Sequence, residues 1–222
     1  ISESIYGMGI IISQCHPTLT NVTISENNQT GIYIVRGNPI LTNVSISGHN
    51  GSRGGGMYLN TSNPILTNVI IRDNTASRSG GGIYVGYHSN PILTNVIISG
   101  NTSYGEDYDR YGGGMFLGEN SNPILTNSII WDNSPESIFF REDYDSSTIS
   151  IQYSDIEGGE DAIVTNDNGE VYWLEGNIDA DPLFTDPDNG DYTLQEGSPC
   201  IDSGDPNLWF EDMDGTTGDM GV

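Results

Sequence analysis

The sequence predicts an all-β fold in which short parallel strands stack, coil upon coil, as a solenoid. A motif spelled NPILTN, or HPTLTN in its first copy, recurs with its prolines at Pro17, Pro39, Pro64, Pro91 and Pro123. The chain has 29 glycines and 10 prolines in 222 residues, and no stretch sustains the apolar spacing of a helix. Because a unit of 22 to 32 residues cannot bury its own apolar face, consecutive units have to stack.

Each unit reads as three short strands separated by corners. A glycine-led apolar run comes first, as in residues 55–60, and the other two runs lie on either side of the last motif asparagine. Residues 40–47 alternate apolar side chains with Thr and Ser, the two-residue period of strands with one solvated face. Five clear coils span residues 6–134, and a degenerate sixth follows, so the coils are predicted to occupy residues 1–157.

The last asparagine of each motif lies at the corner between the second and third strands. A tight bend there favours a residue that tolerates positive φ, and asparagine is the best choice after glycine. Stacked in register, these amides would form hydrogen bonds up the solenoid as an internal ladder. A row of amides offers no acid, base or nucleophile. We therefore predict a structural ladder of Asn21, Asn43, Asn68, Asn95 and Asn127.

These units resemble the right-handed parallel β-helix repeats of the pectate-lyase-like superfamily, through the GGGIY segment at 80–84 and the NPILTNVIISGN segment at 90–101. Residues 176–184, 190–194 and 197–205 resemble the terminal region of such secreted proteins, which an anchoring or sorting domain often follows. The resemblance implies a right-handed parallel β-helix of about six coils that is secreted or displayed at a cell surface, attached through a removed C-terminal region. This superfamily hosts lyases, hydrolases, adhesins and stalks, so the resemblance does not select a function.

The negative charge is concentrated in the second half of the chain. Residues 1–100 hold three acids and four arginines, whereas the remainder holds 28 acids and two arginines, which together give a net charge of −25. This charge excludes non-specific binding to nucleic acid or to an anionic membrane surface. No apolar run reaches the roughly 18 residues of a membrane span. We expect the acidic residues 158–222 to form an irregular cap over the unpaired strand edges at the C-terminal end of the solenoid.

Two loops of this acidic region, residues 186–191 and 212–219, have the aspartates and glycine of a calcium site. Calcium prefers several carboxylate and carbonyl oxygens, although neither loop matches the EF-hand pattern. The alternative is that these residues only make turns and solubilise the surface. The candidate Ca2+ ligands are Asp186, Asp188, Asp191, Asp202, Asp205, Asp212, Asp214 and Asp219.

The longest loop, residues 100–112, lies at the corner between the third strand of one coil and the glycine run of the next. Loops that grow on one side of a solenoid usually mark its working face. Its tyrosines would either stack on the sugars of a cell-surface polysaccharide or pack their own loop. The candidate binding residues are Tyr104, Glu106, Asp107, Tyr108, Asp109 and Tyr111.

The residue types of the coils disfavour catalysis. Polysaccharide lyases need a lysine or arginine base, but lysine is absent and the six arginines do not cluster by coil or corner. Glycoside hydrolysis needs two facing carboxylates, and the first five coils carry almost no acid on their strands. An anionic protein would also repel acidic polysaccharides unless calcium bridged them.

Cys15 and Cys200 lie in the first coil and in the end region, too far apart for an intramolecular disulfide. Either both thiols are free, with Cys200 buried, or a head-to-tail neighbour brings Cys15 of one subunit to Cys200 of another and builds a filament. The sequence therefore predicts a non-catalytic extracellular structural protein, a stalk, adhesin or filament subunit, stabilised by calcium. A polysaccharide lyase or hydrolase and a carbohydrate-binding module remain the alternatives.

Overall fold

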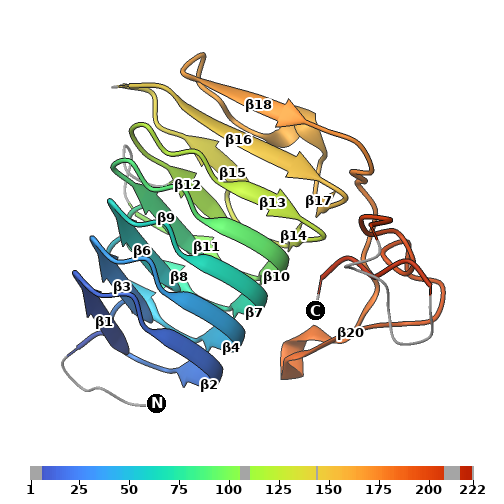
Figure 1. Cartoon of the computed structure of the whole chain (residues 1–222), viewed down its shortest axis with the longest axis horizontal. Coiled ribbons are helices and arrows are strands. Elements are labelled where there is room, and N and C mark those ends of the chain that lie inside the picture. The colour runs from blue at the N-terminus through green and yellow to red at the C-terminus, as the bar shows by residue number, and fades with distance from the viewer. Residues whose placement is uncertain (1–6, 106–110, 144, 208–215, 222) are drawn as a thin grey trace.

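The computed structural model describes residues 7–105, 111–143, 145–207 and 216–221. Its strands stack as a parallel β-solenoid, with successive coils side by side in Figure 1. The predicted fold class is confirmed. Within the described residues, no helix has the length and apolar character needed to cross a membrane.

One six-stranded sheet collects the first strand of each coil. Its strands pair in parallel and in register, so that equivalent residues of successive coils lie side by side. In sheet order they are β1 (Ile10–Ser13), β3 (Ile32–Val35), β6 (Met57–Asn60), β9 (Ile83–Gly86), β12 (Met115–Leu117) and β15 (Ile138–Phe140).

The predicted second and third strands belong to one larger sheet of nine strands. In the first four coils they run on as single strands of eight residues, bent at the motif asparagine. The strands are β2 (Thr18–Ser25), β4 (Ile40–Ser47), β7 (Ile65–Arg72), β10 (Ile92–Ser99), β13 (Ile124–Thr126), β14 (Ile129–Trp131), β16 (Ser147–Gln152), β17 (Asp155–Ile156) and β18 (Gly169–Trp173). A third, narrow sheet consists of β5 (Asn50–Gly51), β8 (Thr75–Ala76) and β11 (Thr102–Ser103).

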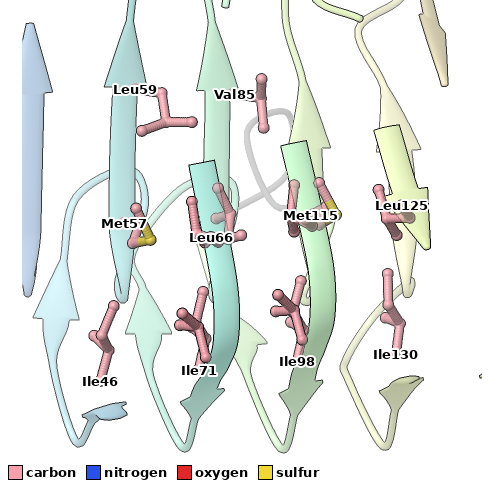
Figure 2. Close-up of a cluster of buried hydrophobic side chains, with 14 of the residues drawn as sticks. Ile46, Met57, Leu59, Leu66, Ile71, Val85, Ile98, Met115, Leu125 and Ile130 are labelled. Atoms are coloured by element: carbon pink, nitrogen blue, oxygen red, sulfur yellow. The ribbon is translucent and has the colours of Figure 1, made fainter. Parts of the chain in front are cut away.

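The core consists of the inward-facing apolar rows of these sheets. Figure 2 shows Ile46, Ile71, Ile98 and Ile130 as one such row, each from a successive coil and each almost fully buried. The glycine runs leave no room for a side chain between neighbouring coils. A Cβ on Gly82 would lie 2.6 Å from the carbonyl oxygen of Gly114 in the next coil. Because glycine has no side chain, the backbones of neighbouring coils can form hydrogen bonds with each other at this corner.

The motif asparagines adopt the predicted left-handed conformation, with φ between 51° and 55°. Asn43 donates a hydrogen bond to Asn21 Oδ1 (3.1 Å) and Asn68 donates one to Asn43 Oδ1 (3.2 Å). These bonds lie on the outside of the solenoid, so the prediction that this ladder is internal is wrong for Asn21, Asn43 and Asn68. Asn127 is buried, and its Oδ1 accepts instead from the backbone N–H of Asp205 (2.7 Å). The inward positions on either side of the bend belong to apolar residues such as Leu41 and Val44, and the bend turns the amide outward.

A buried amide row lies instead at the next corner, after the nine-stranded sheet. Asn74 donates to Asn101 Oδ1 from both its backbone and its side chain, and Asn101 donates to Asn133 Oδ1 in the same way, all at 3.0 Å. In the second coil His49 takes the asparagine's place, with its Nδ1 accepting from the backbone N–H of Asn27 (3.1 Å). The sequence analysis missed this row, although its asparagines recur one residue after each such corner.

Residues 158–178 add a further partial coil, in which β18 pairs with β16. One 3-10 turn, η1 (Glu160–Ala162), precedes β18. This coil lies at the C-terminal end of the stack, where the sequence analysis placed the whole acidic region.

The rest of the acidic region, residues 179–207 and 216–221, is here called the C-terminal segment. It contains β19 (Phe184–Asp186), β20 (Asp191–Leu194) and a 3-10 turn, η2 (Pro187–Asn189). Figure 1 shows it, in orange to red, beside the solenoid rather than beyond its last coil. The prediction that it caps the solenoid end is therefore wrong.

The docking site of the C-terminal segment is an outward-facing row of the nine-stranded sheet. The first two coils carry Thr23 and Ser45 in this row, whereas the next three carry Ile70, Ile97 and Ile129. The C-terminal segment covers the apolar side chains of these isoleucines. It packs against them with the buried residues Phe184, Tyr192, Cys200 and Met220.

Candidate functional site

The outer face of the six-stranded sheet carries one aromatic ring per coil from the second coil to the sixth. Neighbouring ring centroids are 4.6, 5.1, 5.0 and 5.9 Å apart, and the planes of neighbouring rings lie within 15° of parallel. In-register parallel pairing places equivalent side chains at the strand spacing, so the rings stack face to face along the solenoid axis. They are Tyr33, Tyr58, Tyr84, Phe116 and Phe139.

This stacking determines what the rings can offer a ligand. Each inner ring has a neighbour on both faces, and Tyr84, Phe116 and Phe139 are only 3 to 6% exposed. Tyr33 and Tyr58, at the start of the stack, are half-buried. The apolar ring faces are therefore used within the protein, and among the three tyrosines only Tyr33 and Tyr58 are partly exposed.

Two adjoining cavities follow the stack and are here called the aromatic groove. One, of about 320 Å³, is lined by Tyr84, Tyr111, Arg53 and Arg141 among others. The other, of about 440 Å³, is lined by Tyr33 and Tyr58 and again by Arg53. Because Arg53 lines both, the two cavities meet at this side chain.

Two arginines converge on Tyr84 in this groove. The guanidinium carbon of Arg53 lies 5.7 Å from the centre of the Tyr84 ring, and Arg141 forms an ion pair with Glu119 (3.7 Å). Burial raises the pKa of Tyr84 to about 12, although the positive charges of Arg53 and Arg141 act in the opposite direction. Tyr84 is therefore a protonated hydroxyl at neutral pH. The prediction that the arginines do not cluster is wrong for this pair, which coil stacking brings together.

The loop at 100–112 contributes one of its predicted binding residues to the groove. The ring of Tyr111 stacks on Phe139 with centroids 4.2 Å apart. Tyr104 lies at another corner, where its hydroxyl donates to Asn50 Oδ1 (2.9 Å). The other four, Glu106, Asp107, Tyr108 and Asp109, lie outside the described residues. The sequence analysis missed the stacked tyrosines of the strands, although an aromatic residue recurs in their GIY, GMY and GMF segments.

The predicted calcium ligands are not brought together in the described ranges, where no group of three or more His, Cys, Asp or Glu side chains could hold a metal. Asp191 Oδ1 accepts hydrogen bonds from the backbone and hydroxyl of Thr193, which lower its pKa. Similar hydrogen bonds from nearby residues are accepted by Asp186, Asp205 and Asp219. The side chains of Asp188 and Asp202 are exposed. The last two candidates, Asp212 and Asp214, lie outside the described residues. The described contacts are those of turn-forming residues, and calcium binding stays a prediction.

A second cluster of chemical interest lies beneath the C-terminal segment. Cys200 Sγ donates to Asp155 Oδ2 (3.2 Å), and the backbone N–H of Ala180 donates to Asp155 Oδ1 (3.2 Å). Burial raises the pKa of Asp155 to about 6, and it also raises the pKa of the Cys200 thiol.

The position of Cys200 weighs against the predicted contact between subunits. Cys15 is exposed, but Cys200 is fully buried on the side of the solenoid, so it cannot meet the Cys15 of a neighbour while the segment is docked. The predicted burial of Cys200 is confirmed.

Comparisons with known proteins agree with this architecture. The family model described as a right-handed beta helix region matches residues 3–105 and 67–178. The curated proteins contain no match to this chain. The crystal structure of the pectate lyase Pel9A is similar, with a TM-score of 0.54 and 14% sequence identity over 95% of this chain and 68% of that chain. At that identity the similarity shows the fold alone, whereas the family model covers most of the residues. The chain belongs to the right-handed parallel β-helix family.

Proposed function

We propose that this chain is an extracellular, non-catalytic β-helix protein that adheres to polysaccharide through the aromatic groove. The observation that carries the proposal is that tyrosines and two arginines, Arg53 and Arg141, line an open groove along the stack of coils. Polar groups held in fixed positions on a preformed concave surface are typical of ligand sites. The similar protein is, by its title, a lyase of the polysaccharide pectate, and this supports an extracellular, polysaccharide-directed role.

Adhesion fits the described residues better than the other structural roles predicted from the sequence. A filament joined through Cys15 and Cys200 is disfavoured, because Cys200 is buried and a neighbouring subunit cannot reach it. A bare stalk would leave the groove and its converging arginines without a role. Self-association through the ends of the solenoid stays a separate prediction.

Polysaccharide lyase activity is the second candidate, favoured by one observation. Arg53 and Arg141 lie in the groove, and lyases use such a side chain to remove a proton from the sugar ring. An arginine keeps its proton at neutral pH, and the pKa of about 12 makes Tyr84 a poor base as well. Binding without turnover is therefore the function that we propose.

Affinity electrophoresis in gels containing a panel of neutral and acidic polysaccharides tests both candidates. We expect retardation of the wild-type protein by at least one polysaccharide, about tenfold weaker binding for Arg53→Gln, and wild-type behaviour for the matched control Arg36→Gln outside the groove. No retardation by any polysaccharide would overturn the proposed adhesion. New reducing ends or unsaturated products that disappear in Arg53→Gln would establish the lyase instead.

A further inference from the structure

We infer that the aromatic groove selects uncharged, hydroxyl-rich polysaccharide chains over polyuronates and sulfated chains. This inference deepens the proposed function and rests on it. Three features carry it: the phenol groups of the ring stack, the charge of the groove lining, and the distribution of charge along the chain.

The ring edges form a row of hydroxyl groups along the solenoid axis. Tyr33, Tyr58 and Tyr84 follow one another with centroids 4.6 and 5.1 Å apart, and the row ends where Phe116 replaces tyrosine. The rings of Tyr33 and Tyr58 lie within 3° of parallel, which brings their phenol groups near one another. A phenol both donates and accepts hydrogen bonds, as the hydroxyls of a sugar do. A polysaccharide running along the axis would meet the half-buried phenols of Tyr33 and Tyr58 on successive coils.

The formal charges that line the groove cancel among the described residues. Arg53 and Arg141 are balanced by Glu142 and Asp143, and Glu119 lies 3.7 Å from Arg141. Guanidinium groups donate hydrogen bonds and carboxylates accept them, so together they suit a ligand whose hydroxyls do both. A carboxylated or sulfated chain would meet these acids as well as the arginines. The lining therefore offers polyanions no net attraction.

The distribution of charge adds a penalty for polyanions at one end of the groove. Of the 31 acids, 28 lie in residues 101–222, so the coils that carry Phe116 and Phe139 repel an anionic polymer. Screening at physiological salt limits this repulsion to about 8 Å, so it acts at that end of the groove rather than beside Tyr33 and Tyr58. An uncharged chain meets no such penalty.

Matched pairs of polymers test the selectivity. Binding of the wild-type protein would be measured for a polyuronate and its carboxyl-reduced form, and for a sulfated polysaccharide and its desulfated form, at low and high NaCl. We expect the uncharged member to bind at least about tenfold more tightly in low salt, with an affinity that changes little as salt rises. Tighter binding of the acidic members would overturn this inference and leave the proposed adhesion intact. Absence of binding to every member and to the wider panel would overturn the proposed adhesion itself.

Removal of single hydroxyls tests the contact row without disturbing the ring stack. We expect Tyr58→Phe to lose affinity for the uncharged polymer about fivefold, with an unchanged thermal midpoint. Tyr172→Phe removes an exposed hydroxyl on β18, outside the groove, and serves as the matched control. If the double variant Tyr33→Phe/Tyr58→Phe keeps full affinity, the hydroxyl row is not the contact and the inference fails.

Discussion

The thiol of Cys200 donates a hydrogen bond to Oδ2 of Asp155 across 3.2 Å, and both side chains are fully buried. Asp155 continues the outward-facing row in which the preceding coils carry Ile97 and Ile129. Its partners, Cys200 and the backbone of Ala180, both belong to the C-terminal segment. One carboxyl group thus supplies a buried polar link between the solenoid and the segment, beside the hydrogen bonds that Asn127 accepts from the backbone of Asp205 and of Gly221 (2.7 Å each).

This link predicts a pH-dependent stability. Burial raises the pKa of Asp155 from 3.8 to about 6, and Asp179 and Asp181 add to the rise. A raised carboxyl pKa means that the stabilising contribution is present below the unfolded value and is lost as pH rises through about 6. We expect Asp155→Asn, which cannot ionise, to be more stable than the wild type at pH 8 by on the order of 2 kcal/mol. The two should be similar near pH 4, and urea unfolding at both pH values measures the difference.

The exposed Asp161→Asn variant is the control for the general effect of removing a negative charge. If Asp155→Asn and Asp161→Asn change the free energy of unfolding equally at pH 8, Asp155 does not carry the predicted pH dependence.

The docked C-terminal segment predicts that the two cysteines differ in reactivity. Cys15 is exposed, whereas Cys200 is buried and its thiol pKa is raised. Because the thiolate is the reactive form, a thiol reagent should modify one cysteine in the native protein and both in denaturant. Cys15→Ser should show no fast reaction under native conditions. Fast modification of Cys200 in that variant would mean that the segment does not stay docked.

The buried His49 predicts a loss of stability in mild acid. Its Nδ1 accepts from the backbone of Asn27, and its Nε2 contacts the carbonyl of Ile24 at 3.1 Å, which fits the neutral ring. Burial lowers its pKa, so its contribution is present above the unfolded value of about 6.5 and is lost as pH falls. His49→Asn, which restores the residue of the other coils, should flatten the stability profile between pH 7 and 5. The exposed His88→Asn should keep the wild-type profile, and equal profiles for both variants would contradict the assignment.

The buried amide row predicts different costs for two asparagine substitutions. Asn101 accepts from Asn74 and donates to the carbonyl of Ile71 (2.9 Å), so Asn101→Ala leaves buried donors and acceptors without partners. We expect a loss of about 3 kcal/mol in the free energy of unfolding. Asn63 Oδ1 accepts hydrogen bonds from the backbone and side chain of Asn90 on the exposed surface, and Asn63→Ala should cost about 1 kcal/mol or less. Equal losses in chemical denaturation would show that burial does not decide the role of these amides.

Calcium stabilisation remains a prediction from the acidic sequence of residues 186–219. A ligand that binds only the folded protein raises its stability by mass action, so millimolar calcium should raise the thermal midpoint and a chelator should reverse the shift. Magnesium at the same concentration is the control for general screening of the net charge. An identical midpoint with calcium and with chelator would assign these aspartates to turns and solubility.

The local pattern of this sequence determined the coils. The motif repeats and their two-residue alternation located the strands, and the corner asparagines were correctly expected at positive φ, because these properties depend on neighbours in the chain. The local sequence did not determine the direction in which the corner amides point. The inward positions were filled by Leu41, Val44 and their equivalents, so the ladder formed outside.

Only the tertiary structure decided the candidate groove and the place of the acidic region. Arg53 and Arg141 meet at Tyr84 because stacking aligns coils that are distant in sequence, and neither residue has a local signature of that contact. The C-terminal segment lies on the side of the solenoid because Ile97 and Ile129 expose an apolar row there. Burial against that row, rather than the charge of the segment, determines where it docks, and it brings Asp155 and Cys200 together.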